Sequence, residues 1–251
     1  MDPPTDPSRA AGPAHLALLI AAAFLSALYL SWRTLAAADF LYPLLYEPAG
    51  IGVHIDEFAP KNRYKRDFGE TTRAEREALF AAIGRAIRQH GRGLETLTYH
   101  DAQGRELGVL LRSPEIIHLQ DVSRLVHRLE TAGLLALALI AFHLVFLRRR
   151  RLQLPGAGRL LTLVATAVLA TVGLVLAIGP KKVFYAFHET VFPADHEWFF
   201  FYQDSLMSTM MKAPFLFGYI AAALVALALV YLWALFLLAV WATGRRSQPP
   251  R

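Results

Sequence analysis

The chain of 251 residues contains no cysteine. It therefore has no disulfide framework, no thiolate ligand for a metal and no cysteine nucleophile for an acyl-enzyme. It also lacks a GxSxG nucleophile elbow, a P-loop and a GxGxxG run before a predicted helix. None of its nine histidines has the HExxH or HxH spacing that is typical of zinc sites. No cofactor and no metal is therefore expected.

Apolar residues, in contrast, are abundant. They make up 55% of the chain, and the mean hydropathy is +0.35. They gather in four blocks, and a block of about 18 uncharged apolar residues is long enough to cross a bilayer as a helix. The predicted spans are residues 14–32, 132–147, 160–179 and 215–243. The expected fold class is thus a mainly α membrane protein with four transmembrane helices.

The distribution of charge predicts the orientation of these helices. Residues 148–159, between the second and third spans, hold five arginines and no acid, and residues 245–251 hold three arginines. Because short loops rich in Lys and Arg stay in the cytoplasm, we expect both termini and this loop inside (N-in/C-in). Residues 37–131 and 180–213 are then extracytoplasmic. The net charge of +6 does not indicate nucleic-acid binding, since residues 37–131 hold 13 basic and 14 acidic side chains.

The first extracytoplasmic segment is predicted to form a small α+β cap domain. Thr72 and Glu75 have the spacing of a capping box, which predicts a helix that ends near His90. Two candidate strands follow, at residues 94–99 and 106–112, joined by a turn.

Local sequence signals also predict the structure at the ends of this segment. Prolines between residues 40 and 60 favour an extended path there. Ser113 and Pro114 predict the start of a helix that continues into the second span. Residues 1–13, rich in Pro and Ala, are expected to be disordered.

Two histidines stand in patterned surroundings. His118 precedes Asp121 by one helical turn, so the two side chains share a face, and an aspartate that fixes one ring nitrogen leaves the other as a base. His188 lies in an aromatic stretch, residues 181–214, which suits a membrane interface. Several readings remain open: a paired catalytic site, haem binding, or interfacial histidines that bind backbone groups. A metal site formed by His118, His188, His196 and an Asp is a further alternative, for which the spacing gives only a weak signal.

Two short motifs give a resemblance to a known family. These are His118-Leu-Gln-Asp121-Val122 before the second span, and Phe187-His188 followed by Trp198, Asp204 and Pro214 before the fourth. In this order the chain resembles the bacterial lipoprotein intramolecular transacylases.

The resemblance implies an acyl transfer within one substrate. The sn-2 acyl chain of a diacylglyceryl-modified lipoprotein would move to the α-amine of the lipoprotein's own N-terminal Cys, which gives a lyso-form lipoprotein. His118 and His188 would be the catalytic pair, with His118 oriented by Asp121 as the preferred base, although their roles are interchangeable. The supporting residues would be Asp121, Arg124, Asp195, Trp198 and Asp204.

The predicted organisation has five parts. They are a cytoplasmic tail with the first span (1–36), the extracytoplasmic domain (37–131), spans two and three (132–179), the aromatic site segment (180–213), and span four with its tail (214–251). The partners would be lipoproteins and membrane lipids, in the bacterial cytoplasmic membrane, with the active site at the extracytoplasmic face. The alternative is a non-enzymatic membrane protein whose outer domain binds lipid or a protein partner.

Overall fold

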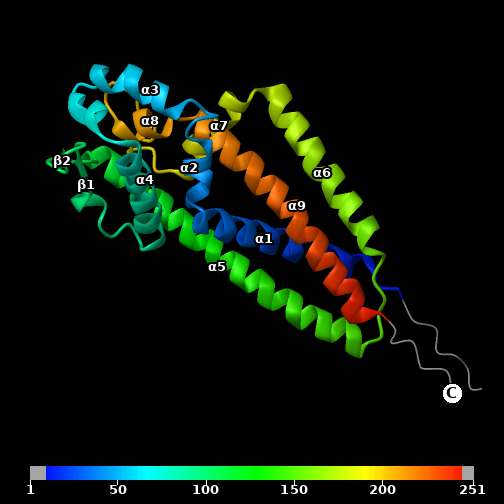
Figure 1. The fold of residues 1–251 in the computed structure, drawn as a ribbon. Coiled ribbons are helices and arrows are strands. Elements are labelled where there is room, and N and C mark those ends of the chain that lie inside the picture. The colour runs from blue at the N-terminus through cyan, green and yellow to red at the C-terminus, as the bar shows by residue number, and fades with distance from the viewer. Residues whose placement is uncertain (1–9, 245–251) are drawn as a thin grey trace, which may run out of the picture. The chain divides into compact units, whose positions relative to one another are not determined.

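A computed structural model describes residues 10–244. Residues 1–9 of the segment predicted to be disordered, and the arginines at 245, 246 and 251, lie outside the described part. For residues 10–13 the prediction of disorder is wrong, because the Ala11 N–H donates to the Gln153 carbonyl at 2.9 Å and α1 begins at Pro13. Figure 1 shows a mainly helical chain with one small sheet. The α-helices are α1 (Pro13–Ala37), α2 (Tyr42–Leu45), α3 (Ile51–Phe58), α4 (Arg73–Arg88), α5 (Ser113–Arg149), α6 (Ala157–Ile178), α7 (Pro180–Val191), α8 (Leu206–Met211) and α9 (Phe215–Thr243), and the short 3-10 turns are η1 (Asp39–Leu41), η2 (Ala59–Lys61), η3 (Arg66–Glu70) and η4 (Leu94–Thr96).

Four helices, α1, α5, α6 and α9, are long and apolar enough to cross a membrane. The prediction of a mainly α membrane protein with four spans is therefore confirmed. Helix α5 has 37 residues, more than the roughly 20 that a bilayer requires, because the outer helix and the second span are continuous, as predicted.

The chain divides into two compact units, and α1, α5 and α9 each have residues in both. The first unit contains residues 10–32, 130–178 and 224–244 among those described. Its core is an apolar cluster from α1, α5, α6 and α9, centred on side chains such as Leu19, Leu232 and Phe236. Large apolar side chains on α6, including Leu169 and Leu176, are exposed, as expected where a helix faces lipid.

The second unit contains residues 33–129 and 179–223 and includes the predicted cap. Thr72 caps α4, because its hydroxyl accepts a hydrogen bond from the Glu75 N–H at 3.1 Å. The reciprocal half of the capping box is absent. Instead, the Glu75 carboxylate accepts from the backbone N–H and the Nδ1 of His100, at 2.9 and 3.0 Å, and so ties α4 to the first strand.

The two strands form an antiparallel pair that is shorter than predicted. Strand β1 is Thr98–His100 and β2 is Glu106–Val109, with a bulge between Tyr99 and His100. The bulge limits the ladder, and Gly108, with φ +145°, supplies the unusual backbone that the irregular register requires.

The prediction of an extended path at residues 40–60 is wrong. The segment consists of η1, α2, α3 and η2. Pro43 and Pro60 occupy the first turns of α2 and η2, where a missing N–H costs nothing and the fixed φ favours a helix. Proline therefore opens helical turns here.

Within the second unit, buried Glu115 links the start of α5 to the residues around α8. Its carboxylate accepts from the Ser205 hydroxyl, from the Met207 N–H at 3.3 Å and from the Arg112 N–H at 2.8 Å. A fully buried carboxylate needs such donors, and here they hold residues 205–207 against α5.

Candidate functional site

The imidazoles of His118 on α5 and His188 on α7 lie together in the second unit. Their ring centroids are 6.2 Å apart and their planes are 28° from parallel. Phe192 packs against both rings, at 5.0 Å from His118 and 5.2 Å from His188. Phe184 lies 4.0 Å from His188, and Phe200 lies 5.9 Å from His118. The aromatic stretch therefore surrounds the two histidines with apolar rings, which limit the access of water.

The hydrogen bond of His188 defines which of its nitrogens can act as a base. Its Nδ1 lies 2.7 Å from the Phe184 carbonyl oxygen, one helical turn earlier in α7. A carbonyl can only accept, so Nδ1 carries the proton and Nε2 has the free lone pair of the neutral ring. Burial lowers the pKa of His188 below its ordinary value, and the hydrogen bond to Phe184 opposes this only in part. His188 thus favours the neutral form that accepts a proton.

His118 is more deeply buried than His188. Its Nδ1 has no hydrogen-bond partner within residues 10–244. A buried polar nitrogen without a partner is costly, typically by about 1–3 kcal/mol. Such an atom is available to a ligand that enters between the rings.

Asp121, the expected partner of His118, makes its hydrogen bonds elsewhere. One carboxylate oxygen, Oδ2, accepts from Nδ1 of His196 at 2.6 Å, and the other pairs with Arg124. The side chain of Asp121 is 4% exposed, whereas that of His196 is 29% exposed. Sequence reasoning did not single out this Asp–His pair, because 75 residues separate its members and no motif links them.

The other predicted supporting residues divide into two groups. The Trp198 ring packs against His188 at 4.9 Å and against Tyr185 at 5.5 Å, so it forms part of the enclosure. Asp204 instead forms an ion pair with Arg63 at 3.1 Å. Asp195 is exposed in a turn before His196.

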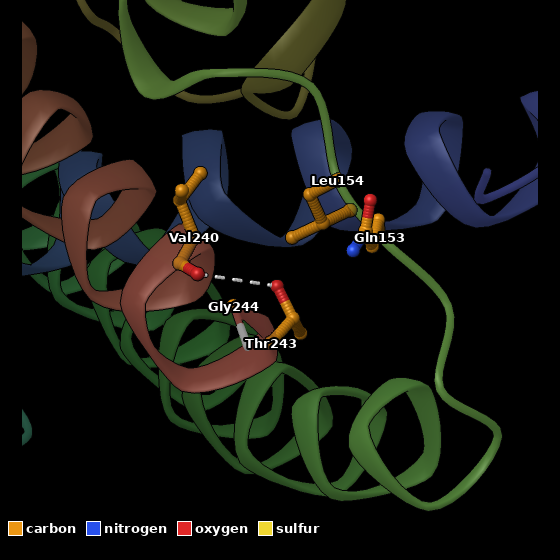
Figure 2. A pocket seen from close by; sticks show the side chains of 5 residues that line it. All are labelled: Gln153, Leu154, Val240, Thr243 and Gly244. Carbon is orange, nitrogen blue, oxygen red and sulfur yellow. Dashed lines mark hydrogen bonds between the residues drawn. The ribbon is translucent and has the colours of Figure 1, made fainter. Parts of the chain in front are cut away.

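One hollow adjoins this site, and a second lies elsewhere. The smaller, of about 150 Å³, is lined by Asp121, Arg124, Leu125, Arg128, Val191, Phe192 and Pro193, and so shares Asp121 and Phe192 with the residues above. The larger, of about 230 Å³, belongs to the first unit and is lined by Gln153, Leu154, Val240, Thr243 and Gly244 (Figure 2). Its Thr243 hydroxyl donates to the Val240 carbonyl, and none of its lining side chains is titratable. The smaller hollow is therefore the one with groups suited to chemistry.

No metal centre is indicated in the described part of the chain. Within residues 10–244, no three His, Asp or Glu side chains cluster closely enough to hold a metal ion.

Comparison with known proteins supports the resemblance. The family model for the lipoprotein intramolecular transacylase Lit matches residues 93–216, which include both histidines. Over these residues the chain matches the lipoprotein intramolecular transacylase family.

Solved structures agree with this assignment at the level of the fold. Two in meso structures of the membrane integral lipoprotein intramolecular transacylase Lit from Bacillus cereus, one of them a point variant, are similar to the chain. The TM-scores are 0.62 and 0.61 at 14% identity, over 91% of this chain and 90% and 94% of theirs. No curated protein sequence matches the chain. The family model and the two solved structures confirm the resemblance that the two short motifs gave.

Proposed function

We propose that this protein is an acyltransferase that moves the sn-2 acyl chain of a diacylglyceryl-modified lipoprotein to the α-amine of its N-terminal Cys. The observation that carries the proposal is the pair of imidazoles, 6.2 Å apart, inside an aromatic enclosure within the segment that matches the family. The site would face the extracytoplasmic side of the bacterial cytoplasmic membrane. The arginines at residues 148–151 support this orientation, since they favour a cytoplasmic position for the loop after α5.

The substrate chemistry explains why the protein needs no nucleophile of its own. Ester and amine belong to one molecule, and a well-oriented intramolecular reaction gains about 7–11 kcal/mol from positioning. The amine nitrogen attacks the ester carbonyl, the new N–C bond forms, and the C–O bond to the glyceryl oxygen breaks. The absence of cysteine and of a serine elbow agrees with this direct transfer.

The two histidines suit two different tasks. His188 has its free lone pair on Nε2, so it accepts a proton from the attacking nitrogen and passes it to the departing glyceryl oxygen. In this proposal the unpaired Nδ1 of His118 carries the ring proton and donates a hydrogen bond to the oxyanion of the tetrahedral intermediate, where a single donor is worth about 10²–10³ in rate. With Asp121 bonded to His196, we assign the base to His188 rather than to His118.

The remaining predicted residues take supporting roles in this proposal. Trp198 holds the His188 ring, and Asp121 and Arg124 form the polar border of the site. Asp204 stabilises the surrounding loop through its ion pair with Arg63, and the exposed Asp195 is assigned no contact with the substrate.

Mass spectrometry of a lipoprotein's N-terminal peptide tests the proposal. The chain is expressed in a host that lacks other N-acylation, together with His118→Ala, His188→Ala and, as a control, His100→Ala, which alters a histidine of the cap hairpin. We expect lyso-form, N-acylated lipoprotein from the wild type and the control. The two site variants should lose at least about 10²-fold of the rate. A wild-type chain that leaves diacylglyceryl-Cys unchanged refutes the activity and favours the non-enzymatic alternative. Full activity in both site variants refutes only the site.

A further inference from the structure

The proposed reaction, on which this inference rests, leaves one proton over in each turnover. Near neutral pH an α-amine is largely an ammonium ion, since its usual pKa is about 7.7–8.0. An ammonium and an ester give an amide, an alcohol and one H⁺. His188 takes one proton from the attacking nitrogen and returns it to the leaving oxygen, so it ends as it began. The first proton of the ammonium must leave by another group.

Asp121 and His196 form the pair that suits this task. Nδ1 of His196 donates to Oδ2 of Asp121 at 2.6 Å, which directs Nε2 of the neutral ring to accept a proton. The buried carboxylate then stabilises the imidazolium that forms, as in other Asp–His pairs. With 29% of its side chain exposed, His196 also reaches water, whereas His118 is buried.

Each member of the Asp121–His196 pair lies close in sequence to a residue of the site. Asp121 lies one turn after His118 on α5, and Trp198, two residues after His196, packs on the His188 ring. Asp121 also lines the hollow of about 150 Å³. The charged or titratable groups around His196 are its partner Asp121 on α5, Arg124, which pairs with the same carboxylate, and the exposed Asp195 and Glu197 beside it in the loop.

We propose that His196, held by Asp121, is a third catalytic histidine, which takes the proton from the substrate's α-ammonium group and releases it to solvent. The N–H bond of the ammonium breaks, its electron pair becomes the nucleophile, and the proton moves to Nε2 of His196 and then to water. No oxidant, metal or second substrate is needed.

The decisive variant is His196→Gln. The Gln amide can still donate to Asp121, so it preserves the contact, but it cannot accept a proton at the pH of the reaction. The matched control is His100→Gln, because His100 also pairs with a carboxylate through Nδ1, at 3.0 Å from Glu75, in the cap hairpin. Rates are measured with the purified full-length protein and a synthetic diacylglyceryl-Cys peptide, at pH 6.5 and pH 9.5.

At pH 6.5 we expect His196→Gln to react about 10²-fold more slowly than the wild type, in the range of general base catalysis. At pH 9.5 the amine arrives mainly neutral, so the loss should shrink to a few-fold. In His196→Ala, added imidazole should restore part of the rate at pH 6.5. The control His100→Gln should react at the wild-type rate at both pH values.

A loss in His196→Gln that is equal at both pH values means that the residue acts only through structure, and it overturns the proposal. So does a wild-type rate in this variant at pH 6.5, or imidazole that restores nothing. If the wild type itself does not convert the peptide, the proposed function fails and this inference fails with it. If the wild type is active and His196→Gln equals it, only the inference fails.

Discussion

The close approach of α1 and α5 at Gly133 gives a prediction whose size follows from the structure. A Cβ added at Gly133 would lie 2.3 Å from Cβ and 2.6 Å from Cγ of Tyr29. Ordinary van der Waals contact begins at 3.4 Å, so the two helices would have to separate locally by about 1.1 Å (3.4 − 2.3). The nearest atom is a Cβ, which cannot rotate away. Small residues at such crossings allow membrane helices to pack closely.

Gly133→Ala is therefore expected to destabilise the protein, and Gly173→Ala supplies the reference. Gly173 lies in α6, and a Cβ there meets nothing within 4 Å. Both substitutions replace a helical glycine by alanine, so the gain in helix propensity, about 0.8–1 kcal/mol, cancels when they are compared. What remains is the cost of overpacking, about 1–3 kcal/mol.

Thermal unfolding in detergent measures this difference. For a chain of this length, 1 kcal/mol corresponds to about 2–4 °C, so Gly133→Ala should melt about 2–12 °C below Gly173→Ala. If the two variants melt at the same temperature, or Gly133→Ala melts higher, the close packing of α1 on α5 at this point is refuted.

Two further predictions concern the second unit. Burial lowers the pKa of His188, so its ring should remain neutral, and still react with diethyl pyrocarbonate, somewhat below pH 6.5. The unfolded chain binds this proton more readily than the folded protein, so the folded protein should lose stability as the pH falls below 6.5. Peptide mass spectrometry measures how the modification of His188 depends on pH, and a midpoint at or above pH 6.5 contradicts the lowered pKa. Glu115→Gln should lower the free energy of unfolding by about 1.5–3 kcal/mol, because it weakens the charged hydrogen bonds to Ser205 and Arg112. The control Glu106→Gln alters an exposed side chain and should change this free energy by less than about 0.5 kcal/mol. Equal melting temperatures for the two variants contradict the prediction.

The sequence predicted the elements that depend on local chemistry. The four spans follow from the length of apolar runs, and α4 follows from Thr72 and Glu75. Sequence reasoning failed where two local signals compete. Proline disfavours a helix in the residue before it, yet it also opens a helix, and at Pro43 and Pro60 the second effect prevails.

The contacts of the candidate site were harder to predict than its members. Spacing along α5 places Asp121 on the face of His118, but it cannot say which of several donors an aspartate will accept from. The structure shows His196 and Arg124 on its two oxygens. Glu115 is a similar case, because its partner Ser205 is 90 residues away. Long-range polar pairs leave no periodic signal in a single sequence.

The location of His196 bears on a general requirement of enclosed sites. Aromatic side chains such as Phe192 and Trp198 limit the access of water, which strengthens hydrogen bonds to the oxyanion but also leaves fewer acceptors for a surplus proton. A reaction that only relays protons between substrate atoms can run in such a site with the two histidines alone. A reaction that begins from an ammonium ion cannot, because its charge must leave. An imidazole that is bonded to a buried carboxylate and partly open to water meets this need, and within the described chain His196 has both properties beside the proposed pair.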